Sequence, residues 1–190
     1  MSAVQKLDAR SYKSMPWKNG GGTTTEIARS PGGDSLADFD WRISMAHVGG
    51  DGPFSIFDGI DRSIAILAGR GMTLGVGQRG EVRLDVSSPP FAFPADLALN
   101  ATLAAGPIDD FNVMTRRGRW RHLLSRLTLD ARAEVAPLGD LAFVFAVGGE
   151  AALADERLRA HDAVLLARGE SVAAVPEPAC ELLVADLWRI

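Results

Sequence analysis

The sequence predicts an all-β protein, on three observations. Apolar and polar residues alternate one by one in several runs, as expected for strands with one buried face. The 20 glycines and 10 prolines are spread along the chain as punctuation between these runs. No segment shows the apolar period of a long helix. Many short strands separated by such turns are typical of a β-sandwich or a β-barrel.

The first predicted strands lie between residues 23 and 86. Thr23–Ala28 is a threonine-rich run behind three glycines, and β-branched residues favour strands. Phe39–Val48 alternates in polarity along its length. Ser63–Leu67 and Met72–Val76 flank a glycine-containing turn and predict a hairpin. Glu81–Val86 follows another glycine turn and alternates charged with apolar residues, so we expect a further strand there.

The remaining strands are predicted in the second part of the chain. Phe111–Thr115 and Trp120–Leu129 lie on either side of a glycine turn. Leu141–Val147 is a continuous apolar run that ends at two glycines, which predicts a strand buried on both faces. Ala163–Ala167 and Leu182–Trp188 complete the series.

Length and composition limit the classes of protein and of site. The 190 residues suit one domain or two tightly fused halves. A net charge of −4 argues against general nucleic-acid binding. The single cysteine, Cys180, excludes an intramolecular disulfide and a cysteine-rich zinc site, and we assign it to the core. The N-terminus lacks the apolar stretch of a secretory signal and no run is long enough to span a bilayer, so we expect a cytoplasmic protein without membrane contact.

Three short motifs match known signatures but lack the context that their chemistry needs. Residues 75–80 spell G-x-G-x-x-G, yet an alternating run follows where a dinucleotide site needs a helix. Residues 33–36 spell the GDSL hydrolase signature, yet no Asp stands three residues before any His. Residues 19–24 are glycine-rich but lack the Lys-Ser/Thr ending of a phosphate loop. We interpret them as a hairpin turn, a loop and a turn of close backbone approach.

Two stretches in the first part of the chain carry candidate functional residues. In PWKNGGGTTTEIA, residues 16–28, Trp17 offers an apolar face and Asn19 a hydrogen-bond donor and acceptor. The alternative is that Trp17 only plugs the end of a barrel. In WRISMAHVGGDGPFS, residues 41–55, Arg42 and Ser44 share one face of the predicted strand. They point inward if the interior is polar and into solvent otherwise, and alternation alone leaves both open.

Two later stretches add further candidates. In FDGIDR, residues 57–62, Arg62 stands just before an apolar strand, as an inward group or as a strand-end arginine in water. In GPIDDFNVMTRRGRW, residues 106–120, Phe111 and Asn112 lie near the start of a strand. The arginines that follow suit a solvated hairpin better than a nucleic-acid surface, because nearby aspartates offset much of their charge.

Together, the four stretches resemble the HutD/Ves family of small bicupin proteins, from about Tyr12 to the C-terminus. The resemblance implies two cupin-like β-barrel halves, at about 10–118 and 119–190, packed as one compact unit. It also implies a link to histidine utilisation, where HutD is associated with binding N-formyl-L-glutamate and with control of pathway flux. The Ves branch implies instead a stress-inducible protein. In the second half, the resemblance places His161 where the cupin pattern usually has glycine and Ala167 where it usually has proline.

The same resemblance argues against a metal site. Aligned with metal-binding cupins, Arg62 lies near the position of the metal-ligating glutamate. The paired histidines of the pattern fall around Ser55–Asp58, which contains none, and the last histidine falls on Val172. Transition-metal sites of cupins depend on imidazole nitrogens. We therefore expect neither a metal nor another cofactor in either half.

An arginine near the metal position suggests an anion site in the N-terminal half, because a guanidinium also attracts carboxylates. We expect a small acidic amino-acid derivative, with N-formyl-L-glutamate as the suspected ligand. Arginines would face its carboxylates, polar residues would bond its amide or formyl group, and aromatic rings would line its apolar stem. The predicted ligand-binding residues are Trp17, Asn19, Arg42, Ser44, Arg62, Phe111 and Asn112.

Three functions are compatible with these residues. The favoured one is a non-enzymatic, regulatory binding protein, because no catalytic set is evident and we assign no catalytic residue. The second is a metal-free cupin enzyme, an isomerase or deformylase, with His47 or Asp110 as its base. The third is a stress-related protein-interaction module. The oligomeric state is open, with a homodimer as one expectation.

Overall fold

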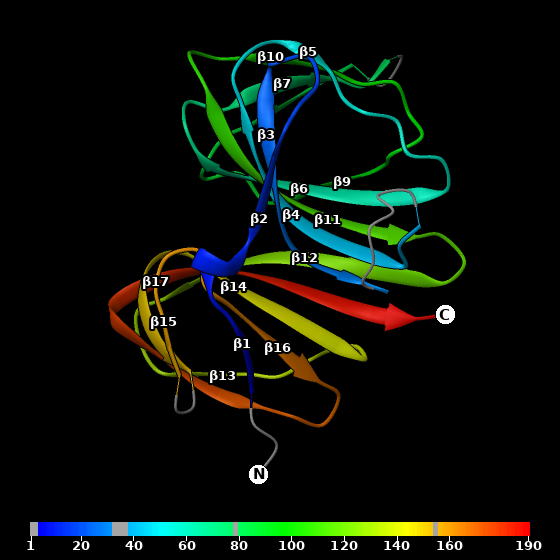
Figure 1. Ribbon diagram of the computed structural model, residues 1–190. Helices are drawn as coiled ribbons and strands as arrows, with labels where there is room; N and C mark the ends of the chain where they lie inside the picture. Colours follow the sequence, from blue (N-terminus) through cyan, green and yellow to red (C-terminus); the bar gives the residue numbers. More distant parts are fainter. Residues whose placement is uncertain (1–3, 32–37, 78–79, 154–155) are drawn as a thin grey trace. The chain divides into compact units, whose positions relative to one another are not determined.

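The computed structural model describes residues 4–31, 38–77, 80–153 and 156–190. Within these ranges the chain is built of β-strands joined by turns and loops, with a single 3-10 turn at Ala9–Ser11 (Figure 1). The prediction of an all-β fold is therefore confirmed. No helix in the described ranges is long and apolar enough to cross a membrane.

The chain divides into two compact units. The first unit comprises residues 13–119, and the second combines residues 1–12 with residues 120–190. The N-terminal residues join the second unit through β1 (Gln5–Leu7), which pairs antiparallel with β16 (Ala163–Ala167). The sequence offers no strand signal at residues 5–7, because the segment is short and mostly polar.

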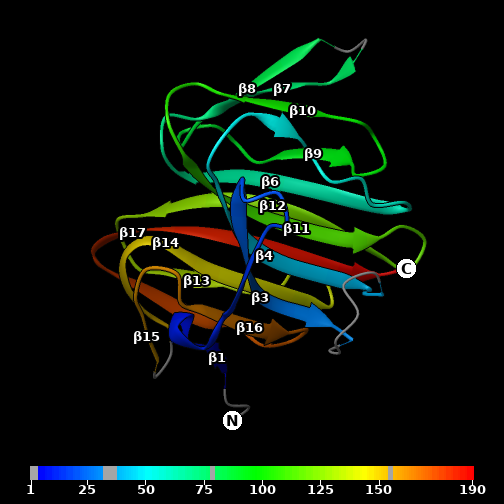
Figure 2. The same cartoon turned by 45° about the horizontal axis from the view of Figure 1, so that its top comes forward.

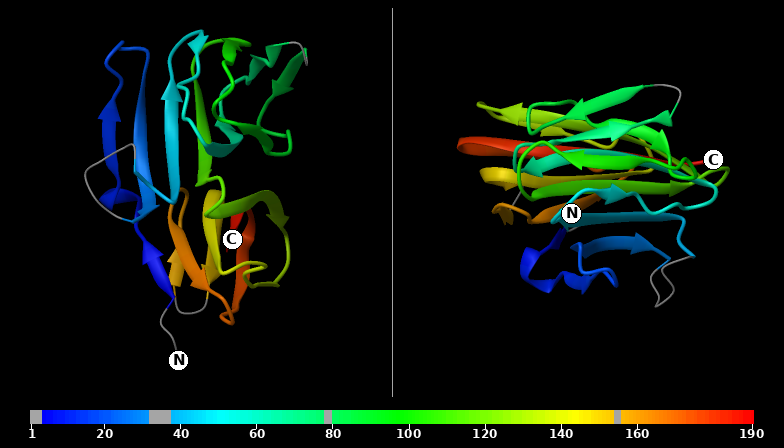
Figure 3. Two further views of the ribbon diagram at one scale, coloured as in Figure 1. Left: turned by 90° about the vertical axis from the view of Figure 1, so that its right-hand side faces the viewer. Right: turned by 90° about the horizontal axis from the view of Figure 1, so that it is seen from above.

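The first unit contains two antiparallel sheets. The six-stranded sheet has the order β2-β3-β4-β11-β6-β9, and β2, β3, β4 and β11 run side by side in Figure 3. Its strands are β2 (Lys13–Pro16), β3 (Gly22–Ser30), β4 (Trp41–Val48), β11 (Ile108–Arg116), β6 (Ile60–Ala68) and β9 (Phe91–Pro94). The four-stranded sheet consists of β5 (Gly52–Pro53), β10 (Asn100–Leu103), β7 (Met72–Gly75) and β8 (Glu81–Leu84), in that order.

A hydrophobic core lies between these two sheets. Figure 2 shows β7, β8 and β10 as one layer and β6, β9 and β11 as another. Buried apolar side chains from both layers pack into one cluster, which includes Ala46, Ile64, Ile66, Met72, Leu74 and Ala101. The face of the six-stranded sheet that bears Ala46, Ile64 and Ile66 is therefore the inward face of the first unit.

The short motifs rejected above form turns where the structure describes them. Residues 75–80 connect β7 to β8, which pair antiparallel, and Val76 N donates to Gly80 O at 2.8 Å. Residues 78 and 79 of this motif lie outside the described ranges, as does the GDSL motif at residues 33–36. Residues 19–24 form the turn between β2 and β3 and the start of β3, and Pro16 pairs with Thr23. The hairpin and turn interpretations are confirmed.

The second unit is one sheet with the path β1-β16-β14-β17-β12, to which β13 and β15 add short edges. Its remaining strands are β12 (Trp120–Leu129), β13 (Ala133–Val135), β14 (Leu141–Leu153), β15 (Glu156–Leu158) and β17 (Val172–Arg189). Residues 142–146 of β14 are all buried, as the continuous apolar run predicts. The core is aliphatic and includes the buried Cys180, which is confirmed as a core residue.

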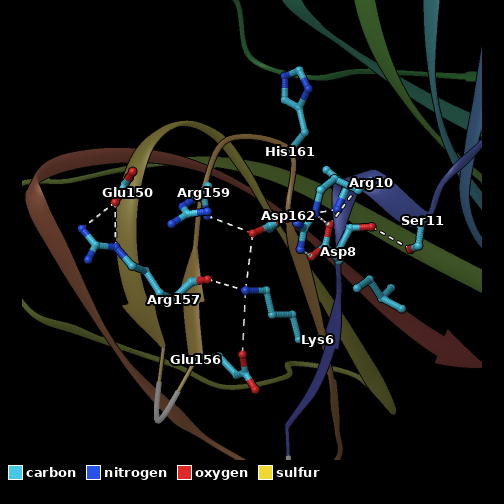
Figure 4. Close-up of polar contacts among 12 residues, drawn as sticks. Lys6, Asp8, Arg10, Ser11, Glu150, Glu156, Arg157, Arg159, His161 and Asp162 are labelled. Atoms are coloured by element: carbon cyan, nitrogen blue, oxygen red, sulfur yellow. Dashed lines mark hydrogen bonds and ion pairs between the residues drawn. The ribbon is translucent and has the colours of Figure 1, made fainter.

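A polar network ties the N-terminal segment to the turn that precedes β16 (Figure 4). The carboxylate of Asp162 accepts hydrogen bonds from Ala9 N at 3.0 Å and from Arg159 N at 3.1 Å. The ammonium of Lys6 lies 3.5 Å from the same carboxylate. The neighbouring His161 has φ 72°, the left-handed conformation that glycine adopts most easily, which gives the physical reason for glycine at this place in the cupin pattern.

Replacing Asp162 with asparagine is expected to lower the free energy of unfolding by about 1–3 kcal/mol. The amide group would turn a donor toward one of the two backbone N–H groups that the carboxylate now accepts. Urea denaturation measures the difference.

Glu156→Gln is the matched control, because Glu156 faces the same Lys6 ammonium at 3.8 Å from an exposed position. Exposed ion pairs contribute about 0–1 kcal/mol, so little change is expected. Equal losses in the two variants would contradict the role given to Asp162.

Candidate ligand-binding site

The central strands of the six-stranded sheet place a row of polar side chains on the inward face of the first unit. Ser44 of β4 pairs with Glu26 of β3 on one side and with Asn112 of β11 on the other. Residues directly opposite one another in a sheet project from the same face. Ser44 also shares its face with Ala46, which belongs to the core. The row therefore points into the interior between the two sheets.

Two arginines stand in the neighbouring row of the same face. Met114 of β11 pairs with Arg42 of β4 and with Arg62 of β6. Arg42 is 6% exposed and Ser44 is 3% exposed, so both lie inside the unit. Alternation alone had left open whether these residues face solvent or the interior, and the register decides for the interior.

Arg62 is held by a neutral partner. It is 8% exposed, and its Nε and Nη2 donate to Asn112 Oδ1 at 2.8 and 2.5 Å. Its Cζ lies 4.6 Å from the centroid of the Phe54 ring and 5.7 Å from that of Phe93. Burial lowers the pKa of Arg62 to about 10, against the charge of Asp110, which raises it. At neutral pH the guanidinium therefore remains a buried cation.

Asn112 links Arg62 to Asp110 through hydrogen bonds at both ends of its amide group. Its Nδ2 donates to Asp110 Oδ1 at 2.5 Å, so its amide lies between a cation and a carboxyl group. Asp110 is 1% exposed, and burial raises its pKa to about 6, while the charge of Arg62 and the bond from Asn112 oppose the rise. Arg62, Asn112 and Asp110 thus form a buried chain of hydrogen bonds across β6 and β11.

Arg42 belongs to a second polar group beside this chain. Its Nε donates to Glu26 Oε2 at 2.8 Å, and Arg29 Nε lies 3.3 Å from Glu26 Oε1. Together the two groups contain three arginines and two carboxyl groups. With both carboxyl groups ionised, the polar cluster formed by Glu26, Arg29, Arg42, Arg62 and Asp110 carries a net charge of +1.

Several donors of this cluster are unpaired within the described residues. There, Arg62 makes no hydrogen bond besides those to Asn112, which leaves Nη1 free. Arg42 makes none besides that to Glu26, and Ser44 Oγ makes none in the same ranges. No atom of Arg62, Arg42 or Ser44 is among the fully enclosed side-chain atoms that lack a partner in the described chain, so the free donors of these three residues keep some accessible surface. Free donors on a positive cluster suit an anion.

The other three predicted binding residues have different surroundings. Trp17 packs against the hydrophobic core, and its Nε1 donates to Thr24 Oγ1 at 2.8 Å. Asn19 is exposed, and its Oδ1 accepts a hydrogen bond from Gly21 N at 3.1 Å within the turn. Phe111 neighbours Asn112 in β11 and therefore projects from the opposite face of the sheet. The structure thus brings together Arg42, Ser44, Arg62 and Asn112.

Four members of the site were missed by sequence reasoning. Glu26 and Phe54 lie within the stretches singled out above, but nothing in their spacing shows that they contact arginines. Phe93 comes from β9, which had no strand prediction. Asp110 was considered only as a base. The two base candidates are separated, because His47 is exposed on the opposite face and bonds Asp109 Oδ1 at 2.7 Å.

A search for metal ligands finds no group of three His, Cys, Asp or Glu side chains arranged to hold an ion in the described part of the chain. The chemistry that the interior offers is hydrogen bonding and charge pairing from guanidinium and hydroxyl donors.

Comparison with known proteins shows the family to which this chain belongs. The family model HutD matches residues 9–184. The chain belongs to the HutD family. A protein from the hutC 3′ region of Pseudomonas putida is 43% identical over 122 residues, which cover 64% of this chain and 63% of that protein. Protein Ves of Citrobacter koseri is 30% identical over 97% of this chain and 94% of its own length. The prediction of a HutD/Ves family member is confirmed.

Solved structures support the same HutD assignment. The structure of HutD from Pseudomonas fluorescens SBW25 is similar with a TM-score of 0.85 at 32% identity, covering 99% of this chain and 100% of that one. YhhW from Escherichia coli is similar in fold, with a TM-score of 0.70 at 8% identity and 97% coverage of both chains. This HutD-family chain therefore has an all-β bicupin fold, as predicted.

Proposed function

We propose that this HutD-family protein is a non-enzymatic, regulatory binding protein of histidine utilisation. In this proposal the interior of the first unit binds N-formyl-L-glutamate or a similar acidic amino-acid derivative, without a metal. The family assignment supports the link to histidine utilisation, since one relative is described by its place beside hutC. The chemistry of the polar cluster supports the class of ligand.

The observation that carries this proposal is the buried guanidinium of Arg62, which lacks a carboxylate partner. No carboxylate oxygen of the described residues lies within 4.0 Å of it. A buried charge without an opposite charge is costly. Removing one partner of a buried ion pair, for example, destabilises a protein by about 3–5 kcal/mol. A ligand carboxylate at the free Nη1 would supply the missing charge.

The remaining donors suit the rest of such a ligand. Arg42 has its Nη groups free for a second carboxylate, and Ser44 lies one row away with a free hydroxyl for a formyl or amide oxygen. The net positive charge of the cluster disfavours an ammonium group. N-acylation removes the ammonium of an amino acid, so an acyl derivative suits this interior better than the free amino acid does.

The remaining predicted binding residues do not contact the ligand in this proposal. Asn112 acts as a positioning residue, because both ends of its amide are already engaged by Arg62 and Asp110. Trp17 closes the core near the β2–β3 turn. Asn19 and Phe111 make no contact with the ligand, given the exposed turn and the opposite sheet face on which they lie.

Calorimetric titration of chelator-treated protein with N-formyl-L-glutamate tests the proposal. We expect saturable binding of one ligand per chain with micromolar affinity, equal to about 8 kcal/mol. L-glutamate and L-histidine are the controls and should bind far more weakly. The titrated sample is then assayed for free formate.

Unchanged ligand after saturable binding supports a sensor. Released formate would instead favour the deformylase alternative. Absence of both heat and thermal stabilisation at millimolar ligand would contradict the proposed ligand class, since binding to the folded state must raise its stability.

A further inference from the structure

Asp110 is a buried carboxyl group whose only hydrogen bond in the described chain comes from a neutral amide. Asn112 Nδ2 donates to its Oδ1, and Oδ2 has no partner among the described residues. No arginine, lysine or histidine nitrogen of these residues lies within 4.0 Å of the carboxyl group. The negative charge of Asp110 is thus balanced only at longer range, through Asn112, by the guanidinium of Arg62.

Few other charged groups of the described residues lie near Asp110. Its cross-strand partners, Ala46 of β4 and Ile66 of β6, are apolar. The four-stranded sheet contributes apolar residues such as Met72 and Leu74 to the same core. The charged groups on its own face are Arg62 of β6, Arg42 of β4 and Glu26 with Arg29 of β3. Asp109 projects from the other face, where it is bonded to His47.

The charge of the cluster depends on the state of Asp110. With Asp110 ionised the cluster carries +1, which one carboxylate neutralises. A dicarboxylate would leave an excess negative charge in a buried place, and such an excess is strongly disfavoured. Protonation of Asp110 raises the cluster to +2, which matches the dianion. The charge of Arg62 lowers the pKa of Asp110. A ligand carboxylate at Arg62 would offset that positive charge, and the pKa of Asp110 would rise.

We propose that a dicarboxylate ligand enters the first unit together with one proton, and that Asp110 takes this proton up. The inference rests on the proposed function and adds a rule of specificity to it. The site distinguishes dianions from monoanions by a proton, and its affinity for dianions depends on pH. Asp110 is a positioning residue in this scheme, because it acts on the ligand through Asn112 and Arg62.

The sign of the pH dependence follows from linkage. Burial holds the pKa of Asp110 near 6 in the free protein, and a nearby anion raises it further. Between the free and the bound pKa, the complex holds more protons than the free protein does, so affinity falls as pH rises. Below pH 6 Asp110 is already protonated and affinity becomes flat. A rise of one unit in the pKa corresponds to about a tenfold change in affinity.

The test is calorimetry at pH 7 in two buffers of different ionisation enthalpy, phosphate and Tris. N-formyl-L-glutamate is compared with N-formyl-L-glutamine, which keeps the shape but replaces one carboxylate by an amide. We expect the first ligand to take up about half a proton to one proton, and the second less than half as much. The dissociation constant of the first ligand should rise about tenfold from pH 6 to pH 8.

Two variants assign the proton. Asp110→Asn should lose both the proton uptake and the pH dependence, and at pH 8 should bind N-formyl-L-glutamate as tightly as the unmodified protein does at pH 6. Asp109→Asn should keep the proton uptake and the pH dependence, because Asp109 lies on the other face and its charge raises the pKa of Asp110 less than burial does. Circular dichroism confirms that each variant is folded.

The outcomes separate the two proposals. Binding without proton uptake, equal uptake for both ligands, or uptake that persists in Asp110→Asn would each overturn this inference alone. Failure of both ligands to bind the unmodified protein would overturn it together with the proposed ligand class.

Discussion

Replacing Arg62 with alanine is expected to weaken N-formyl-L-glutamate binding by about 100-fold or more. The change removes the free Nη1 donor and the buried positive charge that the proposed carboxylate pairs with. Hydrogen bonds to charged groups contribute about 1.5–3 kcal/mol each, and a 100-fold loss corresponds to about 2.7 kcal/mol. Titration calorimetry measures the affinity, and thermal unfolding shows whether the variant is folded.

Arg62→Lys separates charge from geometry. Lysine keeps the positive charge, but its ammonium is a single point that cannot hold Asn112 Oδ1 along one edge and offer a second edge to the ligand. We therefore expect an intermediate loss of about tenfold.

Arg117→Ala is the matched control in the same unit. Arg117 is exposed and pairs with Asp61 and Asp96. Its removal should leave the affinity within about twofold, because screened surface charges contribute little at a distance. If Arg62→Ala bound as tightly as Arg117→Ala does, the carboxylate would have to sit elsewhere.

Alternation predicted that Arg42 and Ser44 share one face of their strand. Whether that face points into the interior or into solvent could be decided only from the position of the second sheet. Inward orientation follows from the second layer, to which Met72 and Leu74 contribute their side chains. The sequence separates these strands by many residues, and local periodicity carries no information on which face a distant sheet will cover. The same limit explains why Phe111 and Asn112, adjacent in the sequence, were assigned to one site although they project from opposite faces.

Contacts between side chains of distant strands were the least predictable part of the site. Arg62 reaches Asn112 across β6 and β11, and Phe54 covers the guanidinium from the segment after β5. Glu26 meets Arg42 because of the β3–β4 register, which contains an irregularity between Glu26 and Ala28. Such an irregularity shifts the alternation of side chains and leaves no reliable trace in composition. Family resemblance located the stretches, whereas the structure supplied their pairings.

The largest expected effect on stability is that of Gly22→Ala, a change in the three-glycine turn. A Cβ at Gly22 would lie 2.3 Å from the backbone oxygen of His47 and 2.9 Å from two ring atoms of Trp17. Neither neighbour can move cheaply. The first belongs to β4, paired with β3 at this point, and the Trp17 ring is held by its bond to Thr24. We expect a loss of about 3 kcal/mol or more in the free energy of unfolding, at the upper end of overpacking changes.

Gly21→Ala is the control from the adjacent position. The nearest atom to a Cβ there is the Asn19 side-chain oxygen at 3.4 Å, an ordinary contact on an exposed residue. The backbone of Gly21 is not left-handed, so alanine should fit and change stability by less than about 1 kcal/mol. Urea denaturation of the two variants measures the difference. Equal stability would mean that β3 and β4 can separate at this end without cost.

The three glycines of the turn would then be required to different degrees, and the G-G-G motif alone does not show why. Gly20 supplies a left-handed turn residue with φ 71°, and Gly22 lets β3 pass close to β4 beneath the Trp17 ring. Glu26 lies four residues further along β3, where it bonds Arg42. A displaced β3 would therefore also shift the carboxylate that fixes one of the two ligand-facing arginines. Gly22→Ala protein that remains folded should accordingly bind N-formyl-L-glutamate more weakly than Gly21→Ala protein does, although neither glycine touches the polar cluster.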